Sequence, residues 1–588
     1  MSGPVLAAFR SHSIPAGLQG TLASSSCIGR SAALRRTQLH ARCAGRAVRD
    51  LHTRNYQTEV FSERVGVEPA LIVPKSKVGR PPEPSQVVTR PFGLQERYFV
   101  SVRGYRGCAD PFTIAAISTE DLPPIRTEQI VLTWAALRVR HPLLAARVQT
   151  TPAGPSFVYL PPLTKAHVLI ESRMHLEFRD ADDRQAAIDA LEARWRGVAL
   201  VDAIDPRHKL YSAVWIRSPS GSGTGSQYAM GFQSTHFTVD GLGMFDVVGE
   251  FMELLANPGR AEAELDEYFA DPNPTLPEPC ERLLPEPEAS SKEEKCKGRQ
   301  AYKELMAGGE GELINGIFPD GTLKGNEIEA YSARHSWSTE ETRAIVDACK
   351  KHHVTVTQFV ASVMVIATIQ ELQRVGRPVP QGGVMKIHVP IDLWSRARSD
   401  KRGVAVRMSH YPIFVHAPST NLLDTKHGDL EDAILEVARQ YKDGHANVVD
   451  SQHFWHLIRH YLVDCQKAID ALARSPSDLD AIPFLPLFSS TGNLNKLIPS
   501  SLPAVAPVSK GADVVARAQS RGSGKIHVQD LTINQKCNPA IVIAHLWTFN
   551  GRLNYNFTYN RRWASAGVMD PYIKRMIDMI SSFAQRKL

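Results

Sequence analysis

Hydrophobic and polar residues follow two periodic patterns in this chain, one typical of helices and one typical of strands. Between residues 126 and 148 the apolar residues recur at helical spacing, which predicts an amphipathic helix that ends before Pro142. Ser338 and Glu341 form a capping box, which marks the start of another helix. The helical pattern predicts further helices at residues 181–195, 241–259, 338–351, 430–445, 454–472 and 570–585, and a strongly apolar helix around 359–369.

Alternation of apolar and polar residues in other segments predicts β-strands. Strands are expected at residues 157–161, 210–218, 227–236, 384–393, 409–417, 525–533, 540–550 and 552–560. Because strands and helices are mixed along the whole body, the predicted fold class is α/β or α+β.

A Pro- and Glu-rich stretch at residues 271–298 interrupts these patterns, and its composition is typical of a connection between two lobes. Residues 73–86, "VPKSKVGRPPEPSQ", have the composition of a linker. The predicted organisation is therefore an N-terminal arm at 1–55, a linker at 56–89, a first lobe at 90–260, an interlobe connection at 261–330 and a second lobe at 331–588.

The positive charge of the chain is concentrated near its N-terminus. The formal net charge is +7, yet residues 1–49 contain no Asp or Glu and carry many Arg and Ser residues. This composition predicts a mitochondrial transit peptide. The alternatives are a disordered arm or a start codon assigned too far upstream, and the alternative location is the cytoplasm. The remaining body is close to neutral, so no nucleic-acid partner is expected.

The cysteine spacing and the length of the apolar runs argue against a zinc- or disulfide-stabilised protein and against a membrane-spanning protein. None of the 8 cysteines forms a C-x-x-C pair, so we expect neither a structural zinc site nor a disulfide framework. The longest apolar run, residues 359–369, is too short to span a membrane and suits a buried helix. We therefore expect a protein with no metal site and no transmembrane segment.

One short stretch carries candidate chemistry. In "FQSTHFTVDGLG", His236 follows a predicted strand and precedes Asp240 and Gly241, which begin a predicted helix. A neutral imidazole is suited to removing a proton from a hydroxyl near neutral pH. Asp240 is a candidate brace that pairs with an arginine, and Gly241 would let the chain turn sharply into the helix. The alternative is a packed histidine at a strand end, with Asp-Gly serving only as a turn.

This His-x-x-x-Asp-Gly motif resembles that of the acyl-CoA-dependent acyltransferase superfamily, which includes plant BAHD enzymes, condensation domains and fungal alcohol and trichothecene O-acetyltransferases. Several stretches resemble the superfamily in the same order: "LTWAALRVRHPLLAARV", "STHFTVDG", "HHVTVTQFVASVM", "HVPIDLWSRAR", "FSSTGNLNKLIPSSL" and "LWTFNGRLNYNFTYN". The resemblance covers residues 90–583 and is closest to the fungal enzymes. The plant-type Asp-Phe-Gly-Trp-Gly segment is absent.

The resemblance implies a two-lobed fold of the chloramphenicol-acetyltransferase type with an interlobe tunnel, and His236 as the general base. Acyl-CoA would be the co-substrate, a small-molecule alcohol of secondary metabolism the acceptor, and no cofactor would be bound. Ser490 or Thr491 would donate to the oxyanion, unless both belong to an exposed turn. The family's Asp-x-Arg strand reads Asp392-Leu393-Trp394 here, so Arg396 or Arg398 becomes the candidate partner of Asp240. We expect a monomer.

Two other functions stay open at this point. The N-terminal arm favours a mitochondrial carnitine acyltransferase or dihydrolipoyl acyltransferase. Thr235 stands where the first would have a glutamate, and the second would carry its motif near the C-terminus. The displaced arginine favours a non-catalytic relative that binds a ligand or a partner.

Overall fold

The computed structural model describes residues 87–585, apart from internal segments. The predicted N-terminal arm at 1–55 and nearly all of the linker at 56–89 lie outside the described residues, as does Arg398. The internal segments that are not described are residues 104–106, 198–202, 219–225, 284–289, 315–329, 397–402, 419–421, 424–426, 475–485, 505–523, 537–541 and 562–563.

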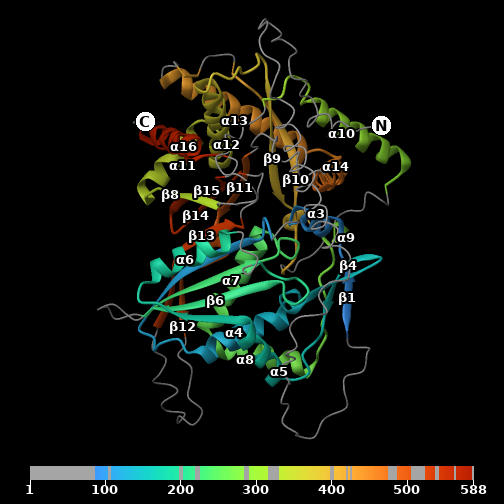
Figure 1. The fold of residues 1–588 in the computed structure, drawn as a ribbon, viewed down its shortest axis with the longest axis vertical. Coiled ribbons are helices and arrows are strands. Elements are labelled where there is room, and N and C mark those ends of the chain that lie inside the picture. The colour runs from blue at the N-terminus through green and yellow to red at the C-terminus, as the bar shows by residue number, and fades with distance from the viewer. Residues whose placement is uncertain are drawn as a thin grey trace, which may run out of the picture. The chain divides into compact units, whose positions relative to one another are not determined.

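The first lobe is built on a six-stranded sheet (Figure 1). Its strand order is β12 (Ser501–Ala504), β13 (Gly524–Gln535), β2 (Pro111–Glu120), β7 (Gln227–Ser234), β6 (Tyr211–Ser218) and β5 (Leu176–Asp180). A smaller sheet contains β1 (Val88–Pro91), β4 (Gly154–Tyr159) and β3 (Arg147–Thr151).

Helices cover both faces of the larger sheet. Alternate residues of β2 point to opposite faces, so Phe112 and Ile114 pack against α6 (Arg184–Arg196), while Ala115 and Ile117 face the main core of the lobe. That core also contains residues of α4 (Thr127–Arg140), α5 (Lys165–His175), α7 (Gly241–Ala256) and α8 (Pro258–Ala270). The helix predicted at 126–148 ends at Arg140, before Pro142, as expected.

The second lobe has a four-stranded sheet and a two-stranded ribbon. The sheet order is β11 (Pro486–Asn493), β14 (Val542–Phe549), β15 (Arg552–Asn560) and β8 (Ala330–Ser336), and the ribbon pairs β9 (Val384–Asp392) with β10 (Met408–His416). The helices of this lobe are α11 (Thr339–Lys351), α12 (Val356–Arg374), α13 (His427–Val449), α14 (Phe454–Arg474) and α16 (Ala566–Gln585).

Helix α12 is the predicted strongly apolar helix. By length and composition alone it could cross a membrane, but 78% of its most apolar window is buried inside the protein. Residues from Phe359 to Leu372 belong to the core of the second lobe. We therefore interpret α12 as the central helix of a packed lobe.

Two of the predicted domain boundaries need correction. Helix α8 packs on α4, so the first lobe continues to Ala270 rather than ending at residue 260. Strands β12 and β13 lie in the part of the chain assigned to the second lobe, yet β13 pairs with β2 of the first lobe. The reason is that β13 has alternating apolar residues that complete the first sheet, whereas β14 returns to the sheet of the second lobe.

The connection between the lobes also forms helices, α9 (Cys280–Leu283) and α10 (Lys292–Ala307). Ser291 and Glu294 form a capping box at the start of α10, and this helix packs on α14. The described part of the predicted connection therefore contributes to the lobes rather than serving as a simple linker.

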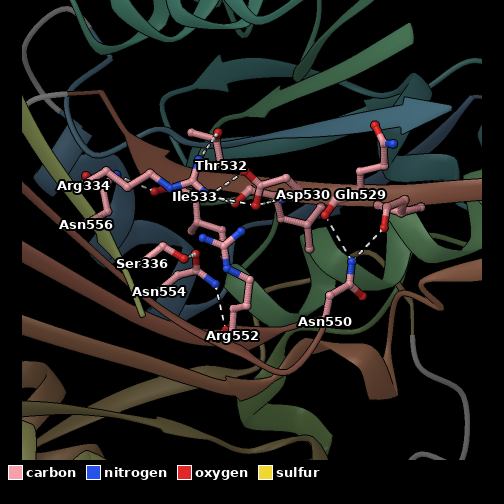
Figure 2. A network of polar contacts seen from close by, with 12 residues as sticks. Arg334, Ser336, Gln529, Asp530, Thr532, Ile533, Asn550, Arg552, Asn554 and Asn556 are labelled. Carbon is pink, nitrogen blue, oxygen red and sulfur yellow. Dashed lines mark hydrogen bonds and ion pairs between the residues drawn. The ribbon is translucent and has the colours of Figure 1, made fainter. Parts of the chain in front are cut away.

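A polar network joins the two sheets where β13 lies beside β15 and β8 (Figure 2). Arg334 of β8 donates to both carboxylate oxygens of Asp530 at 2.8 Å and to Thr532 at 3.1 Å. Asn556 of β15 is fully buried, donates to the Ile533 carbonyl at 2.8 Å and accepts a hydrogen bond from Ser332. Hydrogen bonds are directional, so this contact fixes the register between the sheets better than apolar packing would.

This network predicts that Asn556→Ala destabilises the protein. The substitution leaves the Ile533 carbonyl buried without a partner, which costs about 1–3 kcal/mol. The midpoint of urea unfolding, followed by tryptophan fluorescence, should therefore fall.

The matched control is Gln300→Ala, because Gln300 is exposed on α10 and bonds only within its helix to Glu304. Its midpoint should stay close to that of the wild type. Equal midpoints for both variants would contradict the role assigned to Asn556.

Candidate active site

His236 lies in a tight turn between β7 and α7. The turn spans residues 235–238 and is closed by a hydrogen bond from the Thr238 N–H to the Thr235 carbonyl. The hydroxyls of Thr235 and Thr238 are 2.5 Å apart and buried, and the Thr235 N–H donates to the carbonyl of Leu210, the residue before β6. The sheet of the first lobe therefore holds the backbone on both sides of the imidazole.

The His236 imidazole is desolvated and neutral near pH 7. Burial lowers its pKa to about 4, and the backbone carbonyls of His236 and Val239 act in the opposite direction. Its Nδ1 is buried and makes no hydrogen bond within the described part of the chain. The Phe99 ring stacks on the imidazole, with centroids 3.8 Å apart and planes at 14°.

A buried ion pair of Asp110 and Arg103 contacts the backbone of His236. Asp110 precedes β2, is fully buried and accepts the His236 N–H at 3.3 Å. Arg103, the last residue of α3 (Leu94–Arg103), donates its Nε to the same carboxylate at 2.8 and 2.9 Å. The positions of α3, β2 and the His236 turn are thereby coupled through one carboxylate.

Asp240 links the start of α7 to the second half of the chain. Its Oδ1 accepts the Gly243 N–H at 2.8 Å, which makes Asp240 the N-cap of α7. Its Oδ2 accepts the backbone N–H of Arg407 at 2.7 Å. Burial raises the pKa of Asp240 to about 6, and these two N–H donors act against that rise. This geometry is consistent with the predicted role of a structural brace.

Of the two predicted arginine partners of Asp240, Arg398 lies outside the described residues and stays a prediction, whereas Arg396 needs correction. Arg396 donates to the Val449 carbonyl at 3.1 Å and its guanidinium lies over the Phe454 ring, so it is engaged elsewhere. Arg407 takes the position next to Asp240, because its backbone faces the carboxylate. Its buried guanidinium donates to the Glu278 carbonyl at 2.7 Å.

Gly241 does not have the backbone role that its position predicts. It is the first residue of α7, and its φ lies outside the left-handed region. The turn into the helix is made by Asp240, whose backbone is extended as an N-cap requires. A Cβ added at Gly241 would meet the Thr491 methyl group at 3.8 Å, an ordinary contact.

The two predicted oxyanion donors are both engaged in other hydrogen bonds. Ser490 of β11 lies 2.8 Å from the Thr357 hydroxyl of α12, so its side chain points into the helices of the second lobe. The Thr491 hydroxyl donates to the Leu546 carbonyl at 3.4 Å, although its methyl group lies near Gly241. We therefore do not assign either residue to the oxyanion.

Two histidines that the sequence analysis does not single out lie near His236. His410 of β10 packs near Phe99, with ring centroids 6.2 Å apart. His545 belongs to β14, where its side chain lies on the face opposite to that of Leu546. Burial lowers the pKa of each to about 4, and the charge of His236 contributes to both shifts. The Nδ1 atoms of both are buried and lack a hydrogen-bond partner among the described residues.

The signal for these two residues is present in the sequence. Each lies within a largely apolar segment, in "SHYPIFV" and "IVIAHLWTF". A buried polar nitrogen without a partner calls for a ligand or a catalytic role.

No group of three or more His, Cys, Asp or Glu side chains in the described residues is arranged to hold a metal ion. A hollow of about 930 Å³ lies on the first lobe, where Arg126, Asp180 and Arg217 contribute to its lining. Its lining residues do not include any of the side chains around His236. The predicted interlobe tunnel stays a prediction.

These features define the class of fold. The chain has the two-lobed fold shared by chloramphenicol-acetyltransferase-like acyltransferases and condensation domains, as the sequence predicted.

Individual solved structures support this assignment. The trichothecene 15-O-acetyltransferase TRI3 of Fusarium sporotrichioides superimposes with a TM-score of 0.64 at 17% identity, over 85% of this chain and 96% of that chain. The SgcC5 protein of Streptomyces globisporus gives a TM-score of 0.52 at 14% identity, over 84% and 99%. The cyclization-docking bidomain of the peptide synthetase EpoB of Sorangium cellulosum gives 0.50 at 12% identity, over 85% and 85%. No family model and no curated protein sequence matches this chain.

The buried carboxylate of Asp110 predicts a pH-dependent stability. Burial raises its pKa to about 6, above the value of about 3.9 expected in the unfolded chain. Between about pH 3.9 and pH 6, Asp110 is therefore protonated in the folded protein and ionised in the unfolded chain. This contribution to stability is present below about pH 4 and is lost as the pH rises through about 6.

Asp110→Asn cannot titrate at this position. As the pH falls from 7 to 5, the urea midpoint of the wild type should therefore rise relative to that of Asp110→Asn. Asp240 titrates in both proteins and cancels from the comparison. A difference between the two midpoints that stays constant over this range would contradict the buried carboxylate.

Proposed function

We propose that this protein is an acyl-CoA-dependent O-acyltransferase that esterifies a hydroxyl of a small molecule, with His236 as the general base. The observation that carries the proposal is the desolvated, neutral imidazole, held in a tight turn and tied through Asp240 to the second half of the chain. The acetyltransferase among the structures of the same fold supports the reaction class.

The reaction is a direct transfer. His236 Nε2 removes the proton from the acceptor hydroxyl while the oxygen attacks the thioester carbonyl of the donor. The tetrahedral intermediate collapses, the C–S bond breaks, and the imidazolium returns its proton to the departing thiolate. No acyl group is attached to the protein in this scheme.

The tetrahedral oxyanion requires a hydrogen-bond donor in a site from which water is excluded. We assign this role to His545, because its Nδ1 is buried without a hydrogen-bond partner among the described residues, and because a protonated His236 would lower its pKa. Its strand face also supplies Trp547 and Phe549 to the core of the first lobe, so His545 faces the lobe that carries His236.

Asp240 acts as a positioning residue. Its carboxylate accepts hydrogen bonds from the N–H groups of Gly243 and Arg407. It keeps the His236 turn and the segment at Arg407 at a fixed separation. The acyl donor and the acceptor hydroxyl can then meet at the His236 imidazole.

His236→Ala should lower the turnover of acyl transfer by about 10²–10⁴-fold. The assay follows release of the CoA thiol from acetyl-CoA and longer acyl-CoA donors, with a panel of alcohols from short alkanols to terpenoid alcohols. Because burial lowers the pKa of His236 to about 4, the wild-type rate should be flat between pH 5.5 and 8.

The control is His416→Ala, since His416 is an exposed residue at the end of β10. It should retain full turnover. Undiminished ester formation by His236→Ala would exclude the mechanism. Absence of transfer from every donor in the wild type would favour a non-catalytic, ligand-binding protein.

His545→Phe should lower kcat by about 10–10³-fold while leaving the affinity for acyl-CoA nearly unchanged, because an oxyanion donor acts mainly in the transition state. His545→Gln keeps an N–H donor and should recover part of the loss. Equal kcat values for the Phe variant and the wild type would remove His545 from the reaction.

A further inference from the structure

One face of the β9–β10 ribbon has an unusual composition. Met385, Ile387 and Val389 on β9 face the apolar core of the second lobe. The residues between them, Lys386 and His388, face the other way, as does His410 across the ribbon. A ribbon covered on both faces is normally apolar on both, so a covered face with a lysine and two histidines calls for a function.

Helices α14 and α3 cover this polar face, and both lie close to the ribbon (Figure 1). The Tyr461 hydroxyl of α14 lies 2.6 Å from His388 Nδ1, and the Lys386 ammonium lies over the Tyr461 ring at 5.2 Å. Tyr98 of α3 packs near His410, with ring centroids 5.9 Å apart. The neighbouring residue of α3 is Phe99, which stacks on His236. The polar row therefore extends from His236 to Lys386.

The side chains of this row are deep in the protein and still keep accessible surface. Burial lowers the pKa of Lys386, His388 and His410 and raises the pKa of Tyr98. Yet all four are only half-buried by surface area. These side chains are therefore desolvated yet keep part of their surface accessible, and the row ends near the candidate base.

Lys386 is the cation at the far end of the row. Among the described residues, no carboxylate lies within ion-pair distance of its ammonium. Cys465 and, to a smaller extent, Asp464 act to raise its pKa, but the Asp464 carboxylate accepts hydrogen bonds from Tyr302 at 2.9 Å and Lys467 at 3.3 Å. Desolvating a cation without a counter-ion is costly, and a bound anion would offset that cost.

The spacing along the ribbon sets the size of the ligand. Lys386 pairs with Phe414, which is four residues from His410, so Lys386 and His410 are about 13 Å apart along the ribbon at about 3.3 Å per residue. A molecule that spans this distance and continues past His410 would place an anion at Lys386 and its other end toward His236.

We propose that the acceptor is a hydroxy acid, whose carboxylate pairs with Lys386 and whose hydroxyl reaches His236. This inference rests on the proposed function, since it names the substrate class of the same site. His388 and the Tyr461 hydroxyl provide polar contacts along the chain of the acceptor. Phosphates of the acyl-CoA donor carry the same type of charge, so the experiment must separate the two sources.

The test is calorimetric binding of ω-hydroxydecanoate to the full chain, compared with decanediol, which has the same length and no charge. The wild type should bind the hydroxy acid about tenfold more tightly than the diol, and Lys386→Met should lose this preference. Lys386→Arg keeps the charge and should keep most of it. Lys574→Met is the matched control, because Lys574 is exposed on α16 and pairs with Asp578.

Each outcome decides between defined alternatives. Equal binding of acid and diol by the wild type, or a preference that persists in Lys386→Met, would overturn the proposal. A loss of acetyl-CoA affinity in Lys386→Met without any acid preference in the wild type would assign the anion to the donor and also overturn it. The urea midpoint of each variant verifies that it is folded.

The two proposals can fail separately. His236→Ala should retain the preference for the hydroxy acid, because Lys386 and not the base binds the carboxylate. If this preference is present but no acyl-CoA donor supports transfer, the acid-binding site stands and the acyltransferase assignment fails.

Discussion

The pairing of β13 with β2 is the constraint on which the rest of the structure depends. It inserts a strand from the second half of the chain into the sheet of the first lobe, and β14 then returns to the second lobe. The two lobes are therefore joined by a backbone ladder rather than by a flexible linker. The polar contacts of Arg334 and Asn556 fix the register beside this strand. The result is a rigid junction at which side chains from both halves meet around His236.

Desolvation is the common electrostatic feature of this junction. His236, His410 and His545 are all neutral near pH 7, because burial lowers their pKa values to about 4. Neutral imidazoles can act as a base or as hydrogen-bond donors without adding positive charge to the site. Lys386 is the exception in this row, and its charge gives the site one end that discriminates between anionic and neutral ligands.

The elements were predictable from the sequence because their signals are local. The capping box at Ser338, the helix that starts at Gly241 and the alternating strands near the C-terminus all occur where the periodicity places them. The pairing of β13 with β2 was not predictable, because it joins segments about 400 residues apart and no local pattern encodes it.

The same distinction holds within the candidate site. The motif locates His236 and Asp240, but the arginine next to Asp240 depends on how the chain returns from β9 to β10. Arg407 rather than Arg396 therefore takes that position. Ser490 could not be assigned from its motif, because one residue of strand register decides which lobe a side chain faces. Phe99 and Asp110 belong to segments without a motif, and only the fold brings them to the imidazole.

The central claim is that the junction around His236 receives an acyl-CoA donor. Calorimetric binding of acetyl-CoA and longer acyl-CoA species to the full chain, with no acceptor present, tests it most directly. The account predicts binding at micromolar strength by at least one of these donors, with mass spectrometry detecting no acyl group on the protein afterwards. Absence of binding by every acyl-CoA, or a stable acyl-protein adduct, would contradict it.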